Sequence, residues 1–282
     1  MSFERSEKDI VQVPYKLTKS AAFSIMRSIR RRRTQGKLTK EDFIMKRIFS
    51  ILLIAALACS LSVVQEPEQA QAAGKKVIVI DAGHQSRANG SMEPIGPGAS
   101  KKKAKVTGGA SGCVTHLPEY KLNLQVAKKL KKELQKRGYK VIMVRTKNKV
   151  NISNAGRAKI ANKYKADAFI RIHANSAGSS SVKGALTIAP TSSNKYMSKK
   201  NRKKSQRLSK KVLSYMCKAT GAKNRGVMRT DTMSGINWCK VPVTIVEMGF
   251  MSNPSEDRKM ASGSYQKKIV KGIANGIDKY FT

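Results

Sequence analysis

The chain has 282 residues, of which 40% are hydrophobic and 6% are aromatic, and its formal net charge is +40 at pH 7. Apolar runs recur at regular intervals along it, which excludes a disordered chain and indicates a folded core. So large a positive charge attracts polyanions, namely nucleic acid, anionic lipid or wall polymers that carry phosphate and carboxylate groups.

The first element along the chain has the pattern of an export signal. Two basic residues precede an apolar run at 48–64, and the small-residue motif Ala70-Gln71-Ala72 follows it. This order predicts a secretory signal peptide at 45–72, cleaved before Ala73, and a secreted or wall-associated protein. Two alternatives stay open, a retained membrane anchor formed by 48–64 and a lipid-modified Cys59.

Residues 1–44 precede the methionine, Met45, at which a signal peptide would begin. They are interpreted as a basic N-terminal tail or as the product of an over-long start. We therefore expect the folded domain to span 73–282, because no second globular pattern or internal repeat follows.

Strands and helices alternate after residue 73. The segment 118–138 predicts an amphipathic helix, since leucine or valine recurs at every fourth position between Leu122 and Leu134. The stretch 83–117 is polar and rich in Gly, Ser and Lys, and we expect a loop there that forms one wall of a substrate groove. The alternation predicts a single α/β domain with a mostly parallel, twisted sheet flanked by helices. Strands are expected at 76–82, 140–145, 168–174, 184–190 and 241–250, and further helices at 153–164, 205–220 and 265–281.

Four residues capable of metal binding or proton transfer fall at one edge of this sheet. His84, His173 and Glu247 come at or near the ends of three predicted strands, and Glu119 opens the helix at 118–138. Because ligand sites in parallel sheets lie at the carboxyl ends of the strands, we expect these four side chains to meet.

Two imidazoles and one carboxylate are a common ligand set for catalytic zinc, so His84, Glu119 and His173 are the expected Zn²⁺ ligands. Glu247 lies in an apolar strand, which raises a carboxyl pKa and suits a general acid and base. Each residue also has an ordinary structural explanation: a hydrogen-bonded histidine, an acid at a helix N-terminus, or a glutamate paired with an arginine. His116, in the loop, is the rival metal ligand.

Several ordered motifs together resemble the zinc-dependent N-acetylmuramoyl-L-alanine amidases of bacterial cell walls. They are "VIVIDAGH" (77–84), "PEYKLNLQVAKKLKKELQKRGYKVIMVR" (118–145), "IRIHANS" (170–176) and "VPVTIVEMGFMSNPSED" (241–257). The resemblance implies zinc on His84, Glu119 and His173, Glu247 as catalytic acid and base, and hydrolysis of the amide between N-acetylmuramic acid and L-alanine in peptidoglycan. The family often has "DPGHGG" where this chain has "DAGHQSRANG", which alters the loop and keeps the histidine.

Three further residues are candidates for substrate binding: Asn175, Trp238 and Asn253. Each also has a structural alternative, which is turn capping for the two asparagines and loop packing for the tryptophan. Cys113 and Cys239 lie in predicted loops beside the site, and we expect a disulfide between them in an oxidising compartment.

The expected partners are peptidoglycan and anionic wall polymers, with the chain a monomer. Membrane contact is expected only if residues 48–64 are retained. Two rival functions stay open, a zinc peptidase that cuts within the stem peptide and a non-catalytic protein that binds the wall or polyanions. A nucleic-acid binder is disfavoured by the export signal and by the low aromatic content.

Overall fold

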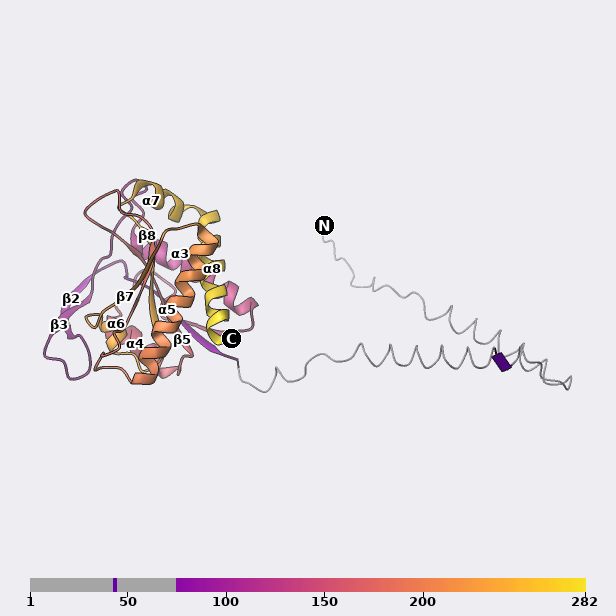
Figure 1. Ribbon diagram of the computed structural model, residues 1–282. Helices are drawn as coiled ribbons and strands as arrows, with labels where there is room; N and C mark the ends of the chain where they lie inside the picture. Colours follow the sequence, from indigo (N-terminus) through magenta and orange to yellow (C-terminus); the bar gives the residue numbers. More distant parts are fainter. Residues whose placement is uncertain (1–42, 45–74) are drawn as a thin grey trace, which may run out of the picture. The chain divides into compact units, whose positions relative to one another are not determined.

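The apolar run that follows Lys76 forms one strand of a six-stranded sheet in the computed structural model, which describes residues 43–44 and 75–282 (Figure 1). The expected signal peptide at 45–72, the alternative anchor at 48–64 and nearly all of the basic tail lie outside the described residues. Among the residues that are described, no helix is both long and apolar enough to span a bilayer.

The sheet has the strand order β4-β1-β5-β8-β6-β7. Neighbouring strands run parallel from β4 to β8, β6 is antiparallel to β8, and β7 is parallel to β6. A mostly parallel sheet was expected, and the structure confirms it. The strands are β1 (Val77–Ala82), β4 (Lys140–Met143), β5 (Ala168–Asn175), β6 (Ala185–Ala189), β7 (Asn224–Arg229) and β8 (Val243–Phe250).

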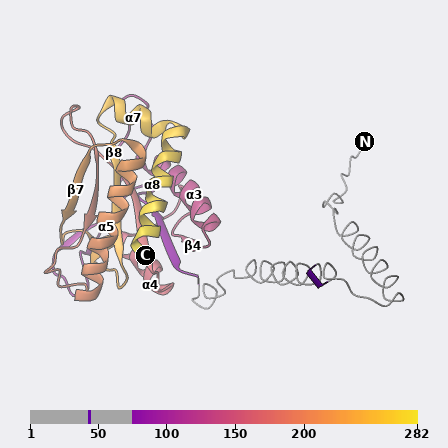
Figure 2. The same cartoon turned by 45° about the vertical axis from the view of Figure 1, so that its right-hand side comes forward.

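Helices cover both faces of the sheet because the central strands are apolar on both sides. Ile78 and Ile80 of β1 belong to the larger core cluster, under α3 (Glu119–Lys136), α5 (Lys199–Thr220) and α8 (Gly263–Phe281). Val79 points to the opposite face, where α4 (Asn154–Lys163) and α6 (Ser234–Asn237) pack. Figure 2 shows α5, α8 and α3 side by side in front of the sheet.

The helix boundaries follow from residues at the ends. Pro118 precedes α3, whose first turn carries Glu119, and the Ser153 side chain accepts a hydrogen bond from the Gly156 backbone at the start of α4. Gly221 ends α5 in the left-handed conformation, with φ 72°, which glycine adopts without steric cost.

Two expectations were incomplete. The stretch 83–117 was expected to be a loop, but it contains the antiparallel hairpin of β2 (Asn89–Pro94) and β3 (Lys102–Val106), whose polar side chains carry no strand pattern. Helix α5 begins at Lys199, earlier than expected, because the Ser198 side chain caps it. Its first turns are rich in lysine and exposed, so they show no apolar period that would predict a helix. β7, α6 and α7 (Pro254–Ala261) were not predicted.

Candidate metal centre

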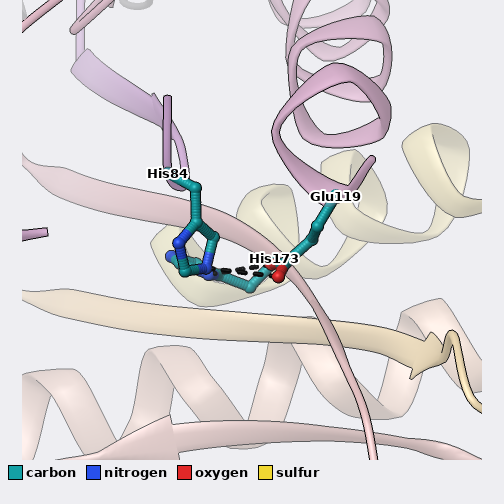
Figure 3. Close-up of side chains that lie close together, drawn as sticks. All are labelled: His84, Glu119 and His173. Carbon is teal, nitrogen blue, oxygen red and sulfur yellow. Dashed lines mark hydrogen bonds and ion pairs between the residues drawn. The ribbon is translucent and has the colours of Figure 1, made fainter. Parts of the chain in front are cut away.

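Three of the four expected side chains meet at the carboxyl edge of the sheet. His84 follows β1, His173 lies near the end of β5, and Glu119 is the first residue of α3. Figure 3 shows the three side chains pointing toward one another. One ligand atom of each lies within 4.8 Å of the others. The edge of the sheet therefore brings together residues that are far apart in the sequence.

Glu119 links the two histidines. Its Oε2 lies 3.2 Å from Nε2 of His84, and its Oε1 lies 3.2 Å from Nδ1 of His173. The two imidazole centroids are 4.8 Å apart, with their planes at 77°. The backbone carbonyl of Thr107 lies 2.9 Å from Nδ1 of His84, so His84 is held from both ring nitrogens. Such a contact on the far nitrogen fixes the orientation of a ligating imidazole.

Backbone and side-chain donors position the Glu119 carboxylate. The amides of Ala110 and Ala174 donate hydrogen bonds of 3.0 and 3.1 Å to its two oxygens, and Nδ2 of Asn123 donates another of 3.1 Å. Burial raises the pKa of Glu119, but the hydrogen bonds from His173 and His84 outweigh it and hold this pKa far below its usual range. Glu119 is therefore an anion at neutral pH.

His173 is in the form that a metal requires. Burial lowers its pKa to about 4, although the hydrogen bond with Glu119 acts in the opposite direction. Its ring is therefore neutral at pH 7 and retains a lone pair. Nε2 is buried and has no hydrogen-bond partner within the described part of the chain. An anionic carboxylate, two imidazoles and an unsatisfied buried nitrogen fit a divalent transition metal such as zinc.

Two glycines make room for this group. A Cβ atom on Gly83 would lie 2.2 to 2.6 Å from three ring atoms of His173. A Cβ atom on Gly109 would lie 2.8 Å from Oε2 of Glu119 and 3.0 Å from Cγ of His84, and Gly109 also has φ 82°. A larger residue at position 83 would displace the His173 ring, and one at position 109 would also be strained by the positive φ.

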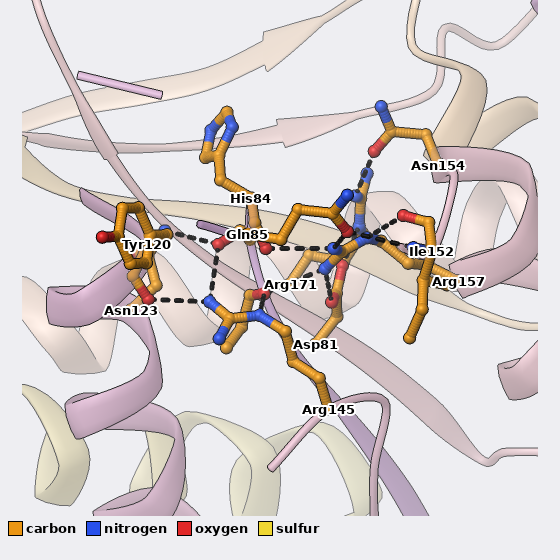
Figure 4. Close-up of polar contacts among 12 residues, drawn as sticks. Asp81, His84, Gln85, Tyr120, Asn123, Arg145, Ile152, Asn154, Arg157 and Arg171 are labelled. Carbon is orange, nitrogen blue, oxygen red and sulfur yellow. Dashed lines mark hydrogen bonds and ion pairs between the residues drawn. The ribbon is translucent and has the colours of Figure 1, made fainter. Parts of the chain in front are cut away.

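A buried ion cluster lies beneath the turn that carries His84 (Figure 4). The Asp81 carboxylate pairs with Arg157 at 2.6 Å and with Arg171 at 2.9 Å. Burial raises the pKa of Asp81, but the two guanidinium groups outweigh it and bring this pKa well below its usual value. The cluster therefore keeps one carboxylate and two guanidinium groups charged inside the domain.

The arginines of this region also hold the main chain of residues 82–84. Arg145 donates to the carbonyls of Ala82 at 2.7 Å and Gly83 at 3.0 Å, and Arg157 donates to that of His84 at 3.0 Å. His84 has φ 59°, a left-handed conformation that is unfavourable for residues other than glycine. These hydrogen bonds hold the turn in that conformation. Sequence reasoning missed this network, although an aspartate inside an apolar strand was a visible signal.

Glu247 lies on β8 directly beside His173, its register partner on β5. Burial and the nearby Glu119 raise the pKa of Glu247 to about 8, while Arg171 lowers it. Its Oε2 is buried and has no hydrogen-bond partner among the described residues. The alternative of a pair with Arg145 or Arg171 does not hold, because these arginines bind backbone carbonyls, Asp81 and Asn154.

The remaining candidates fall outside the group. His116 is exposed and is not among the three clustered ligands. Asn253 caps α7 by accepting from two backbone amides and donates to the Ser180 carbonyl, and the indole nitrogen of Trp238 donates to the Pro94 carbonyl at 2.9 Å. Among the described residues, the Asn175 side chain at the end of β5 bonds only the next amide, and we retain it for substrate contact.

The expected disulfide between Cys113 and Cys239 is wrong, since both cysteines are free. Cys239 is buried in the core cluster on the α4 side, and its thiol donates to the Gly235 carbonyl at 3.0 Å. Burial raises the pKa of this thiol to about 12, which makes it unreactive. Cys113 is exposed in a loop whose backbone is bound to Met251, in the cluster on the opposite face.

Comparisons with known proteins identify the family to which this fold is similar. A family model described as N-acetylmuramoyl-L-alanine amidase matches residues 78–279. The chain is 26% identical over 237 residues to the uncharacterized protein YqiI of Bacillus subtilis (strain 168), covering 84% of this chain and 99% of that protein. It is 30% identical over 165 residues to the N-acetylmuramoyl-L-alanine amidase LytC of the same organism, covering 58% of this chain and 32% of LytC. The solved catalytic domain of the amidase CwlV from Bacillus (Paenibacillus) polymyxa var. colistinus is 28% identical, with a TM-score of 0.59, covering 73% of this chain and 98% of that domain.

Proposed function

The chain belongs to the N-acetylmuramoyl-L-alanine amidase family, and we propose that it hydrolyses the amide bond between N-acetylmuramic acid and the L-alanine of the peptidoglycan stem peptide. The observation that carries this proposal is the convergence of His84, Glu119 and His173, with Glu247 on the adjacent strand. Binding alone does not require a carboxyl group with a buried, unpartnered oxygen beside such a group, whereas catalysis does.

Zinc is the metal that we propose for this group, held by His84, Glu119 and His173. The donor set supports it, because two imidazoles and one carboxylate leave a position open in a tetrahedral site. Bound there, zinc would act as a Lewis acid toward the scissile carbonyl and toward water.

Glu247 is the residue to which we assign proton transfer. Its carboxylate would accept a proton from the attacking water and would then donate it to the leaving nitrogen of L-alanine, so that the carboxyl returns to its starting state. The unpartnered Oε2 and the raised pKa support this assignment, since a group of this kind exchanges protons near neutral pH. Glu119 is unsuited to the task, because both of its oxygens already accept several hydrogen bonds.

Asn175 is the side chain that we propose for orienting the stem peptide. It ends the strand that carries His173, and it is only partly buried. An amide side chain there would donate to a peptide carbonyl and accept from a peptide nitrogen at the same edge of the sheet.

The site of action that we propose is the bacterial cell wall, reached by way of a signal peptide at 45–72 or from a membrane anchor at 48–64. The catalytic domain would then span 73–282, act as a monomer and contact peptidoglycan and anionic wall polymers. The basic composition supports the last point, because a positive field concentrates anionic polymers near the surface.

Product analysis on purified muropeptides tests the proposal. The full chain, the chelator-treated chain with and without added zinc, and the Glu247→Gln variant are each incubated with substrate, with Glu133→Gln on the α3 surface as matched control. We expect the full chain and Glu133→Gln to release free stem peptides with a new L-alanine amino terminus. Chelation should abolish this product and added zinc should restore it, and Glu247→Gln should not form it. Fragments cut inside the stem would identify a zinc peptidase, and intact muropeptides in every sample would identify a binding protein.

A further inference from the structure

A groove of about 390 Å³ lies between α3 and α8, the two helices that Figure 2 shows next to each other. Five lysines line it, three from α3 and two from α8, and Val270 and Glu133 complete the lining. The lysines are Lys129, Lys132, Lys136, Lys267 and Lys271.

The positive charge of this groove is not neutralised by any carboxylate in the described part of the chain. Within the described residues, none of the five lysines forms an ion pair with a carboxylate. Lys129 donates to the neutral side chain of Gln266. Glu133 pairs with Arg137 at 2.6 Å, and Arg137 also pairs with Asp278 at 2.6 Å, so the one acidic group of the lining is already engaged. The groove therefore presents a net positive surface.

The spacing of the lysines destabilises the two helices when no anion is bound between them. Lys132 and Lys136 stand four residues apart on α3, and Lys267 and Lys271 stand four residues apart on α8. Like charges at this spacing face each other and destabilise a helix. An anion bound between the two helices would remove that repulsion.

The number of charges indicates what kind of anion fits. One phosphate monoester carries a charge of about −2 and would leave most of the lysines unneutralised. The lining contains no aromatic side chain on which the bases of a single-stranded nucleic acid could stack. The large hydrophobic side chains that are exposed in the described residues all lie elsewhere, so this surface has nothing to insert into a bilayer. A linear polymer with one phosphodiester charge per unit satisfies all three conditions.

We propose that the α3–α8 groove binds a linear phosphodiester polymer and thereby tethers the domain to an anionic wall matrix. The proposal rests on the proposed function for its location in the wall, but the binding itself requires no catalysis. Lys129 lies ten residues along α3 from Glu119, which is about 15 Å at the rise of an α-helix. A polymer in the groove would therefore leave the metal centre free for peptidoglycan.

Direct binding measurements test the tether. The full chain is titrated into a fluorescently labelled oligo(glycerol phosphate) at several salt concentrations, with fluorescence anisotropy as the readout. The groove variant carries Lys132→Gln, Lys136→Gln, Lys267→Gln and Lys271→Gln. The control carries the same loss of charge on the α4 side, through Lys147→Gln, Lys149→Gln, Lys163→Gln and Lys165→Gln.

We expect the groove variant to bind about 1000-fold more weakly. Its salt slope should fall by about 3, because each lost phosphate contact contributes about 0.7 to that slope. The control should lose no more than about threefold, since distant exposed charges are screened. In the unmodified chain, the polymer should protect Lys267 and Lys271 from acetylation and leave Lys163 reactive, and this readout does not depend on any variant folding.

Equal losses in the two variants, or equal acetylation of all three lysines, would show that binding follows the diffuse field, and the groove would have no special role. Binding to phosphatidylglycerol vesicles through the same lysines, without binding of the oligomer, would replace the polymer with a lipid surface and overturn the proposal. Muropeptide cleavage by the groove variant separates the two ideas, because an intact amidase reaction with lost binding leaves the proposed function standing. Groove-dependent binding without any cleavage would leave the tether standing and refute the proposed function.

Discussion

A single methyl group on Gly83 should weaken metal binding without unfolding the domain. In the structure, the added Cβ would lie 2.2 to 2.6 Å from three atoms of the His173 ring. The backbone of Gly83 cannot retreat, because its amide donates to the Ile172 carbonyl at 2.9 Å and its carbonyl accepts from Arg145 at 3.0 Å. The imidazole of His173 must therefore turn away from Glu119.

The magnitude follows from the cost of overpacking, which is about 1 to 3 kcal/mol in a well-packed site. This cost is met in full only when His173 occupies its metal-binding position, so the zinc affinity falls by the difference between it and the smaller cost in the metal-free protein, which is up to about 2 kcal/mol or about 30-fold. The metal-free protein relieves the contact by moving the ring, so it loses only the hydrogen bond between His173 and Glu119, worth about 1 kcal/mol.

The assay compares the full chain with Gly83→Ala and with Gly90→Ala, a control position where an added Cβ meets nothing within 4 Å. Zinc affinity is measured by competition with a chromogenic chelator, and stability by denaturant unfolding in the presence of excess chelator. Wild-type zinc affinity in Gly83→Ala would refute the reasoning, because the close approach would then place no restraint on His173. A loss of folding in chelator that matches the loss of zinc binding would also refute it.

Three other predictions follow from the same geometry. Asp81→Asn leaves Arg157 and Arg171 buried without their counter-ion and should lower the free energy of unfolding, measured in urea titrations, by about 3 to 5 kcal/mol. A loss below about 1 kcal/mol would mean that water solvates the two guanidinium groups in place of the carboxylate. Because the folded-state pKa of Asp81 lies below its unfolded value of 3.8, its contribution to stability is complete above pH 3.8 and is lost as the pH falls through the lower folded-state pKa. The difference in unfolding free energy between wild type and Asp81→Asn should therefore shrink only on the acid side of pH 3.8, and a difference that shrinks between pH 5 and 7 would contradict this assignment. Glu247→Gln should reduce the hydrolysis rate by about 10²- to 10⁴-fold with unchanged zinc stoichiometry, and loss of zinc in that variant would instead make Glu247 a ligand. Cys113 should react with a thiol reagent in the native protein and Cys239 only after denaturation, so a fall in melting temperature on adding reductant would restore the disulfide hypothesis.

The sequence by itself determined most of the fold. The apolar runs at 77–82, 168–174 and 243–250 form central strands as expected, and the amphipathic segment at 118–138 forms α3. These elements can be predicted because burial of one or both faces produces a regular pattern of apolar residues in the sequence. The hairpin within 83–117 and strand β7 could not be predicted, because their side chains are mostly exposed and follow no apolar pattern.

The sequence also determined which residues gather at the site, since the carboxyl ends of parallel strands share one edge and His84, Glu119 and His173 all fall there. Only the tertiary structure decided which atoms face one another and what holds them. The contact of Gly83 with the ring of His173, and the pairing of Asp81 with Arg157 across 76 positions of the chain, leave no local pattern. The same is true of Cys113 and Cys239, which are unpaired because one lies exposed in a loop and the other is buried in the core cluster on the α4 side. The apolar period of a helix or strand depends only on which of its faces is buried. A contact between two residues far apart in the sequence depends on how their segments pack in the folded domain.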